Sequence, residues 1–188
     1  HVLIELAKCD ENFKFNLDLN NDPEGALFDI IKRLRESSQV QYQVLAQNLE
    51  RFTIDYLLKI YHSSKSLNWH SVLNEDGRVS YNQQVLKGLI KLLFTGNGKR
   101  KDFGELSDTA CQIVSAIYNK YDIYDVYDPC TGSSKLALAA IQDNIEQTNN
   151  CNARYVLGDI NPDAIFFSFA RSLANQIYNV EFRLEDSL

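Results

Sequence analysis

The spacing of apolar residues divides the chain into two parts. Up to about residue 95, apolar side chains recur every three or four positions, which is the period of an α-helix. From residue 107 onward, helical segments alternate with short runs of β-branched and aromatic residues, which are typical of buried strands. We therefore predict a mainly helical N-terminal domain over residues 1–100 and an α/β domain over residues 104–188.

Three helices are predicted in the front part. The first begins at Asp22-Pro23, where a capping residue precedes a proline at the first helical position. The second runs over residues 40–61 and the third over residues 85–93, with a turn at residues 74–77 between them. No segment of this front part carries an evident catalytic motif.

In the rear part, three strands are predicted to alternate with helices. The strands are expected at residues 123–127, 154–157 and 180–184, and the two helices between them at residues 134–146 and from Asn161-Pro162 onward. This order implies a parallel sheet with right-handed crossovers. Ser107 is predicted to cap a helix ahead of the first strand, with an apolar face made of Ile113, Val114, Ile117 and Tyr118.

The charge of the chain limits how it could bind nucleic acid. Its 188 residues carry a formal net charge of -6, whereas contact with phosphates favours a basic surface. Any DNA contact must therefore come from a local basic surface or from a partner. One local candidate is the Gly-rich linker at residues 96–102, whose Lys99-Arg100-Lys101 run either forms a solvated loop or contacts phosphates.

The cysteines and histidines do not form the pattern of a metal site. No two cysteines make a CxxC pair, and the three histidines are scattered along the chain. We interpret the cysteines as reduced thiols of a cytoplasmic protein. No signal peptide or long apolar run is visible in the sequence, so we expect neither secretion nor membrane insertion. The four cysteines are Cys9, Cys111, Cys130 and Cys151.

The first candidate site follows the first predicted strand of the rear part. That strand ends in Asp128, a turn of small residues around Gly132 follows, and a helix begins at Ser134. Such a turn lets the backbone approach a ligand closely, and the amides of a helix start favour polar or anionic groups. The alternative is a tight strand-to-helix turn that binds no ligand.

Acidic residues also end the next two predicted strands. Asp159 stands 31 residues after Asp128 and just ahead of Asn161-Pro162. In a parallel sheet it lies beside the first turn, where a carboxylate can accept hydrogen bonds from both ribose hydroxyls of a nucleoside cofactor. Without a ligand, it is an acid that precedes a helix cap. Glu185-Asp186 ends the third strand, and three such acids in consecutive strand–helix units are hard to assign to chance.

Together these segments resemble the motifs of N6-adenine DNA methyltransferases, most closely those of the modification subunit of type I restriction–modification systems. Residues 128–136 look like the family's DPxxGSG-type cofactor motif, and residues 158–162 resemble its acid followed by Asn-Pro. Residues 185–188 resemble its GDSL motif. Residues 104–108 are similar to its GEFYTP segment, which folds over the methionine end of the cofactor. A helical domain precedes these motifs in the family as well.

The resemblance implies a Rossmann-like methyltransferase core that binds S-adenosyl-L-methionine and methylates adenine N6 in DNA. The methyl group would pass directly from the sulfonium to the amino nitrogen, without a metal. The implied partners are DNA, a specificity subunit that reads the target sequence, and a restriction subunit. The cofactor-binding residues that the resemblance implies are Glu105, Ser107, Asp128, Pro129, Cys130, Thr131, Gly132, Ser133, Asp159, Ile160, Asp186 and Ser187.

The sequence departs from the family pattern at three places. Ser134 stands where the family prefers a second glycine, and residues 104–108 lack the aromatic-Thr-Pro of the family segment. The Asn/Asp-Pro-Pro-aromatic tetrapeptide, which holds the flipped base in the family, does not occur in these 188 residues. We therefore expect the chain to be the front part of the enzyme, inactive alone and with weak or undetectable cofactor binding.

Two other functions fit the same residues. RNA and protein glutamine methyltransferases share the Asn-Pro-Pro-aromatic motif, and nothing upstream of that motif separates them from the DNA enzymes. The other alternative is a degenerate, non-catalytic member that serves as a scaffold or a cofactor sensor. The departures at Ser134 and at residues 104–108 favour this second alternative.

Overall fold

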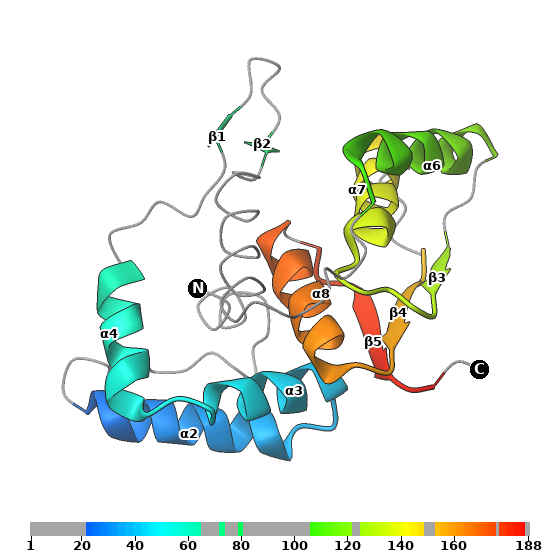
Figure 1. Cartoon of the computed structure of the whole chain (residues 1–188). Helices are drawn as coiled ribbons and strands as arrows, with labels where there is room; N and C mark the ends of the chain where they lie inside the picture. The colour runs from blue at the N-terminus through cyan, green and yellow to red at the C-terminus, as the bar shows by residue number, and fades with distance from the viewer. Residues whose placement is uncertain are drawn as a thin grey trace.

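The computed structural model of the protein describes residues 22–64, 72–73, 79–80, 106–121, 125–148, 153–175 and 177–186 (Figure 1). Helices α2 (Pro23–Glu36), α3 (Val40–Leu49) and α4 (Ile54–Ser64) come first, followed by the short strands β1 (Val72–Leu73) and β2 (Val79–Ser80). The rear part contains α6 (Asp108–Lys120), β3 (Val126–Asp128), α7 (Lys135–Thr148), β4 (Tyr155–Asp159), α8 (Pro162–Ala174) and β5 (Val180–Leu184).

Helix α2 begins where the sequence predicts it. The side chain of Asp22 accepts a hydrogen bond from the backbone N–H of Gly25 (3.0 Å), and Pro23 occupies the first helical position. The cap satisfies one of the amides that a helix start leaves without an intrahelical partner. The same arrangement recurs at α8, where the side chain of Asn161 accepts from the N–H of Asp163 (2.9 Å) ahead of Pro162.

The prediction of one long helix over residues 40–61 is wrong. The segment forms two helices, because α3 ends at Leu49 and α4 begins only at Ile54. Thr53 starts the second helix: its hydroxyl accepts from the N–H of Tyr56 (3.4 Å), and its carbonyl accepts from the N–H of Leu57 (3.1 Å). The threonine cap is the local signal for a break between two helices. The regular spacing of apolar residues continues across it and therefore hid the break.

Strands β1 and β2 form an antiparallel pair that the sequence analysis did not predict. Their register pairs Val72 with Ser80 and Leu73 with Val79. The predicted turn at residues 74–77 lies between them, outside the described residues, as do the predicted helix at residues 85–93 and the linker at residues 96–102.

The rear part contains the predicted three-stranded parallel sheet, and its strand order is β3-β4-β5. Strand β5 matches the predicted segment, β4 begins one residue later and ends two residues later than predicted, and β3 begins only at Val126. Helix α7 connects β3 to β4, and α8 connects β4 to β5 (Figure 1). Because the strands follow one another in sheet order, right-handed crossovers place both helices over the same face. This arrangement of helices on a parallel sheet is an α/β fold.

Alternation along β3 and β5 agrees with that arrangement, whereas β4, between them, is buried along most of its length. Val126, Tyr155 and Val180 are paired across the three strands, and all three are buried. On the opposite face, Tyr127 is 57% exposed and its neighbour in register two strands away, Glu181, is also exposed. In the described chain, the helices thus cover the face that carries Tyr155, and the other face carries a mixture of aromatic and charged side chains.

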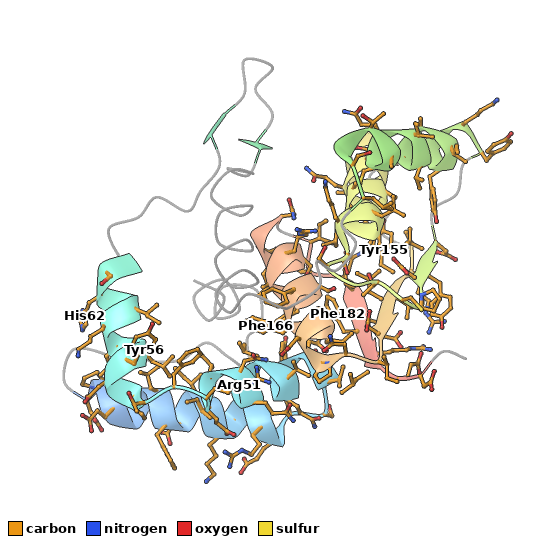
Figure 2. All side chains as sticks on the ribbon, in the orientation of Figure 1. Arg51, Tyr56, His62, Tyr155, Phe166 and Phe182 are labelled. Carbon is orange, nitrogen blue, oxygen red and sulfur yellow. The ribbon has the colours of Figure 1, made fainter. Side chains whose placement is uncertain are left out.

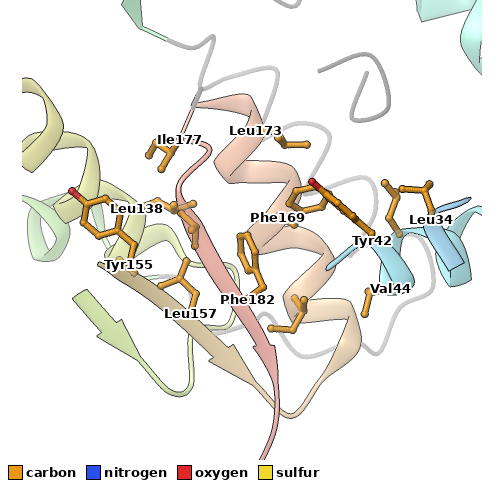
Figure 3. Packing of buried hydrophobic residues seen from close by; sticks show 14 of the residues in the cluster. Leu34, Tyr42, Val44, Leu138, Tyr155, Leu157, Phe169, Leu173, Ile177 and Phe182 are labelled. Atoms are coloured by element: carbon orange, nitrogen blue, oxygen red, sulfur yellow. The ribbon is translucent and has the colours of Figure 1, made fainter. Parts of the chain in front are cut away.

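Helices α2 and α3 share a hydrophobic core with this sheet. The ring of Tyr42 on α3 lies 5.6 Å from that of Phe169 on α8, and Phe169 in turn lies 5.7 Å from Phe182 on β5. Figure 3 shows this row of rings leading from the sheet to Leu34 and Val44. At the surface, Arg51 extends the contact through an ion pair with Asp163 in the first turn of α8 (3.3 Å; Figure 2).

Helix α6 buries only part of the predicted face: Val114 and Tyr118 are half-buried and Tyr118 packs against the core, but the two isoleucines of that face are exposed. Ser107 caps it as expected, accepting from the N–H of Ala110 (3.2 Å). However, Ile113 and Ile117 are 57% and 47% exposed, whereas Cys111 is buried. The helix carries apolar residues on two sides, and its packing against α7 selects the side that includes Cys111. Within the described residues, no helix combines the length and the apolar character needed to cross a bilayer.

Candidate strand-end site

The sheet brings the predicted strand-end acids to one edge. Asp128 ends β3, Asp159 ends β4, and Glu185 and Asp186 directly follow β5. The backbone N–H of Glu185 donates to the carbonyl of Asp159 (3.2 Å), which continues the pairing of β4 and β5 past the end of β5. The carboxyl ends of neighbouring parallel strands therefore form a common surface, which is where open α/β sheets bind ligands.

The Asp159 carboxylate links two elements of this surface. Its Oδ2 accepts from the backbone N–H of Gly132 (2.9 Å), and its Oδ1 accepts from the backbone N–H of Asn161 (2.9 Å). One contact reaches the turn after β3, and the other reaches the cap of α8. Each carboxylate oxygen has two lone pairs, so a carboxylate held in this way keeps acceptor capacity while its orientation is fixed.

The turn between β3 and α7 contains two residues in the left-handed region. Gly132 has φ 54° and Ser134 has φ 57°. Glycine adopts this conformation without a steric penalty, whereas for a residue with a Cβ it costs about 1–2 kcal/mol. The sequence position at which the resembling family prefers glycine therefore has the backbone geometry that glycine favours, although it is occupied by serine.

Buried hydroxyls surround Ser134. Its Oγ lies 2.5 Å from the Thr131 Oγ1 and donates to the Oγ of Ser168 on α8 (2.5 Å). The Ser168 hydroxyl in turn donates to the carbonyl of Gly132 (2.9 Å). Ser134 and Ser168 are 1% and 0% exposed, so these hydrogen bonds satisfy groups that would be costly to bury alone.

Two basic side chains also hold the turn and its surroundings. The guanidinium of Arg171 on α8 donates from one nitrogen to both the carbonyl and the hydroxyl of Ser133 (3.0 Å each). The ammonium of Lys135, at the start of α7, donates to the carbonyl of Leu106 (2.7 Å). The second contact joins Leu106, in the segment that precedes α6, to the start of α7.

Asp128 lies where its negative charge is disfavoured. Burial raises the pKa of its carboxyl above the ordinary value of 3.8, and the nearby charge of Asp159 acts in the same direction. Hydrogen bonds from the Cys130 N–H (3.2 Å) and from the Thr131 side chain oppose the rise without cancelling it.

The remaining predicted site residues fall into three groups. Ile160, Cys130 and Asp186 are exposed beside the strand ends. Thr131 and Ser133 are buried with their hydroxyls bonded inside the protein, so any ligand contact of theirs would come from the backbone. The other predicted residues are Pro129, which is half-buried, Ser107, which caps α6, and Glu105 and Ser187, which lie outside the described residues.

Sequence reasoning missed the α8 residues that support the turn. Ser168 and Arg171 lie three positions apart on one face of the helix. They belong to the mainly apolar segment Phe-Phe-Ser-Phe-Ala-Arg-Ser-Leu-Ala at residues 166–174. Buried polar residues in an apolar helix are paired with other polar groups. This contrast was the available signal, but the sequence alone does not say which groups they meet.

The described residues contain no group of three or more His, Cys, Asp or Glu that could hold a metal ion. A hollow of about 390 Å³ lies against the open sheet face and is lined by Tyr127, Val156 and Arg183 among others. Another, of about 640 Å³, lies beside the start of α2. Neither is lined by Asp128, Gly132 or Asp159.

Comparisons with protein-family profiles, with curated protein sequences and with solved structures found no match to this chain.

Proposed function

We propose that this chain is the cofactor-binding part of an S-adenosyl-L-methionine-dependent DNA adenine-N6 methyltransferase, the modification subunit of a restriction–modification system. The observation that carries the proposal is the Asp159 carboxylate, held by the N–H groups of Gly132 and Asn161 at the end of β4. This arrangement supports a Rossmann-like methyltransferase core, in which an acid in that place binds the ribose.

Residues around Asp159 suit the other parts of an adenosyl group. Ile160, directly after the acid, is 67% exposed, which gives an apolar surface on which an adenine ring can lie. The backbone of the Thr131–Ser134 turn is free of large side chains and can approach the sugar and the methionine part closely. Asp186 follows the neighbouring strand β5, and the side chain of Lys135 joins the start of α7 to Leu106.

Charge favours this cofactor over nucleotides. Asp128, Asp159 and Asp186 gather acidic groups at the strand ends, in a chain whose formal net charge is -6. Such a surface attracts the sulfonium cation and repels the phosphates of ATP or NAD. When bound, the cofactor supplies an electrophilic methyl group, and the residues of this chain contribute binding and orientation.

The conformation of Ser134 bears on the non-catalytic alternative. A serine in place of glycine suggests degeneration when only the sequence is considered. Its φ of 57° keeps the backbone course that glycine would allow, so the substitution does not remove the cofactor turn. DNA and a specificity subunit are the partners that this proposal includes, and the acidic charge of the chain fits target recognition by another subunit.

Competition binding tests the proposal. S-adenosylmethionine should show saturable binding in ligand-observed NMR, which detects affinities down to the millimolar range, while ATP and NAD at equal concentrations should neither bind nor displace it. Equal binding of all three ligands, or displacement of S-adenosylmethionine by ATP, would indicate a general nucleotide site and contradict the proposal.

A further inference from the structure

Three consecutive residues of the cofactor turn are tied to α8. The Gly132 carbonyl accepts from Ser168, the Ser133 carbonyl and hydroxyl accept from Arg171, and the Ser134 hydroxyl donates to Ser168. All of these contacts join positions at least 34 residues apart in sequence. Helix α8 therefore holds the turn through contacts with three successive residues.

We propose that Ser168 and Arg171 are positioning residues for the cofactor turn, and that the Ser134–Ser168 pair replaces a glycine there. The hydroxyl anchor holds Ser134 in a left-handed conformation that its own side chain disfavours. The consequence for ligand binding rests on the function proposed above, whereas the effect on the conformation of the turn does not.

The backbone of Ser134 explains why an anchor is needed. At φ 57° the residue lies in a region that L-residues rarely occupy, and they remain there only where the surroundings fix them. The residue also begins α7, because its carbonyl accepts from the N–H of Leu138 (2.9 Å). A relaxation of Ser134 toward negative φ would therefore disturb both the turn and the first turn of the helix.

Ser168 is placed to control both left-handed residues at once. Its single hydroxyl accepts from Ser134 and donates to the carbonyl of Gly132. Arg171, 9% exposed, fixes Ser133 between them. The turn in this conformation directs the Gly132 N–H to Asp159. The α8 contacts therefore also affect the orientation of the carboxylate that we propose binds the ribose.

A pair of substitutions at Ser134 separates this role from simple packing. Ser134→Ala removes the anchor but keeps the steric penalty of a Cβ, whereas Ser134→Gly removes both. We expect Ser134→Ala to speed amide hydrogen exchange in the turn by roughly five- to thirtyfold, the range set by the left-handed penalty. Ser134→Gly should stay close to wild type. If the side chain served only to fill space, glycine would be the worse replacement.

Ser168→Ala and its matched control complete the test. Ser168→Ala should speed exchange in the turn of the Ser134 protein and have a smaller effect in the Ser134→Gly background, where only the hydrogen bond to the Gly132 carbonyl is lost. Ser172→Ala is the control: Ser172 is also buried on α8, but its hydroxyl donates to the Phe169 carbonyl (2.9 Å). It should leave the turn unchanged. Thermal unfolding of each variant verifies that exchange is measured on folded protein.

Affinity for S-adenosylmethionine, measured on the same variants, should decrease as the exchange rate of the turn increases. Unchanged exchange in Ser134→Ala, or equal effects of Ser168→Ala in both backgrounds, overturns the positioning role. If wild type fails to bind S-adenosylmethionine, the proposed function fails, and the exchange rates still decide whether the α8 anchor exists. If Ser168→Ala does not fold, the Ser134 pair decides alone.

Discussion

The backbone N–H of Gly132 donates a hydrogen bond of 2.9 Å to the carboxylate of Asp159, a residue 27 positions further along the chain. This contact joins the turn after β3 to the end of β4. It brings together two motifs that are separate in the sequence, and it orients the acid at the edge of the sheet where ligands bind in α/β folds.

Asp159→Asn should weaken S-adenosylmethionine binding by about 1.5–3 kcal/mol, because hydrogen bonds to a charged group are replaced by weaker ones. Titration calorimetry or NMR titration on the folded variant measures the change. Asp125→Asn is the matched control. Asp125 accepts from the Arg154 N–H (2.8 Å) at the opposite ends of the strands, and its variant should bind as wild type does. Similar losses in both variants would remove Asp159 from the site.

The contribution of Asp128 to the free energy of unfolding decreases as pH rises, which is the opposite of the usual behaviour of a carboxyl group. Because burial raises its folded-state pKa above 3.8, the folded protein retains this proton where the unfolded chain has lost it. The contribution to stability is therefore greatest below 3.8 and decreases as pH rises through the folded pKa. Asp128→Asn should gain stability relative to wild type as the pH rises from about 4 through the folded-state pKa of Asp128. Denaturant unfolding at each pH measures the difference, and a relative loss over that interval would contradict the assignment.

The shared core predicts that the front helices and the sheet unfold together. Tyr42, 6% exposed, packs against Phe169, so Tyr42→Ala should destabilise the protein by about 3–5 kcal/mol, as for other large aromatic truncations in cores. Phe28→Ala, at a side chain that is 64% exposed on α2, should change stability by less than about 0.5 kcal/mol. If Tyr42→Ala lowers the stability of the front helices but leaves the unfolding transition of the sheet unchanged, the two parts unfold as independent units.

Helix α6 offers a test of which side is buried. Ile113→Gln should alter stability by less than about 0.5 kcal/mol, because Ile113 is 57% exposed. Cys111→Gln should cost about 1–3 kcal/mol, because it places an amide in a site that is 5% exposed. Chemical unfolding of the two variants gives the comparison. A larger loss of stability in Ile113→Gln than in Cys111→Gln would show that the side of α6 with Ile113 is the buried one.

The sequence predicts the rear part better than the front. Strand–helix alternation specifies a parallel sheet, and its geometry then requires that Asp128 and Asp159 end at the same edge. The break at residues 50–53 was missed because Phe52 and Tyr56 continue the helical spacing, although both are about half exposed. The choice between two apolar sides of α6 depends on α7, a tertiary contact that no local pattern encodes.

The support of the turn at residues 131–134 was the feature least accessible to prediction. The acids and Gly132 are visible as a motif, but Ser168 and Arg171 acquire their role only because a crossover returns α8 to the turn. Ser134 illustrates the same limit. Its identity alone suggests a lost glycine, while its buried hydrogen bonds show how a serine occupies the same backbone conformation.

Amide NMR of the 21.5 kDa chain, titrated with S-adenosylmethionine, tests directly whether the strand ends form an adenosyl site. We expect saturable shifts of the Gly132, Asp159 and Ile160 amides. Adenosine should shift the same residues, and 2′,3′-dideoxyadenosine, which lacks the hydroxyls that Asp159 would bind, should shift them much less. Shifts confined to other regions, or equal responses to adenosine and its dideoxy analogue, would contradict the assignment of the strand ends as an adenosyl site.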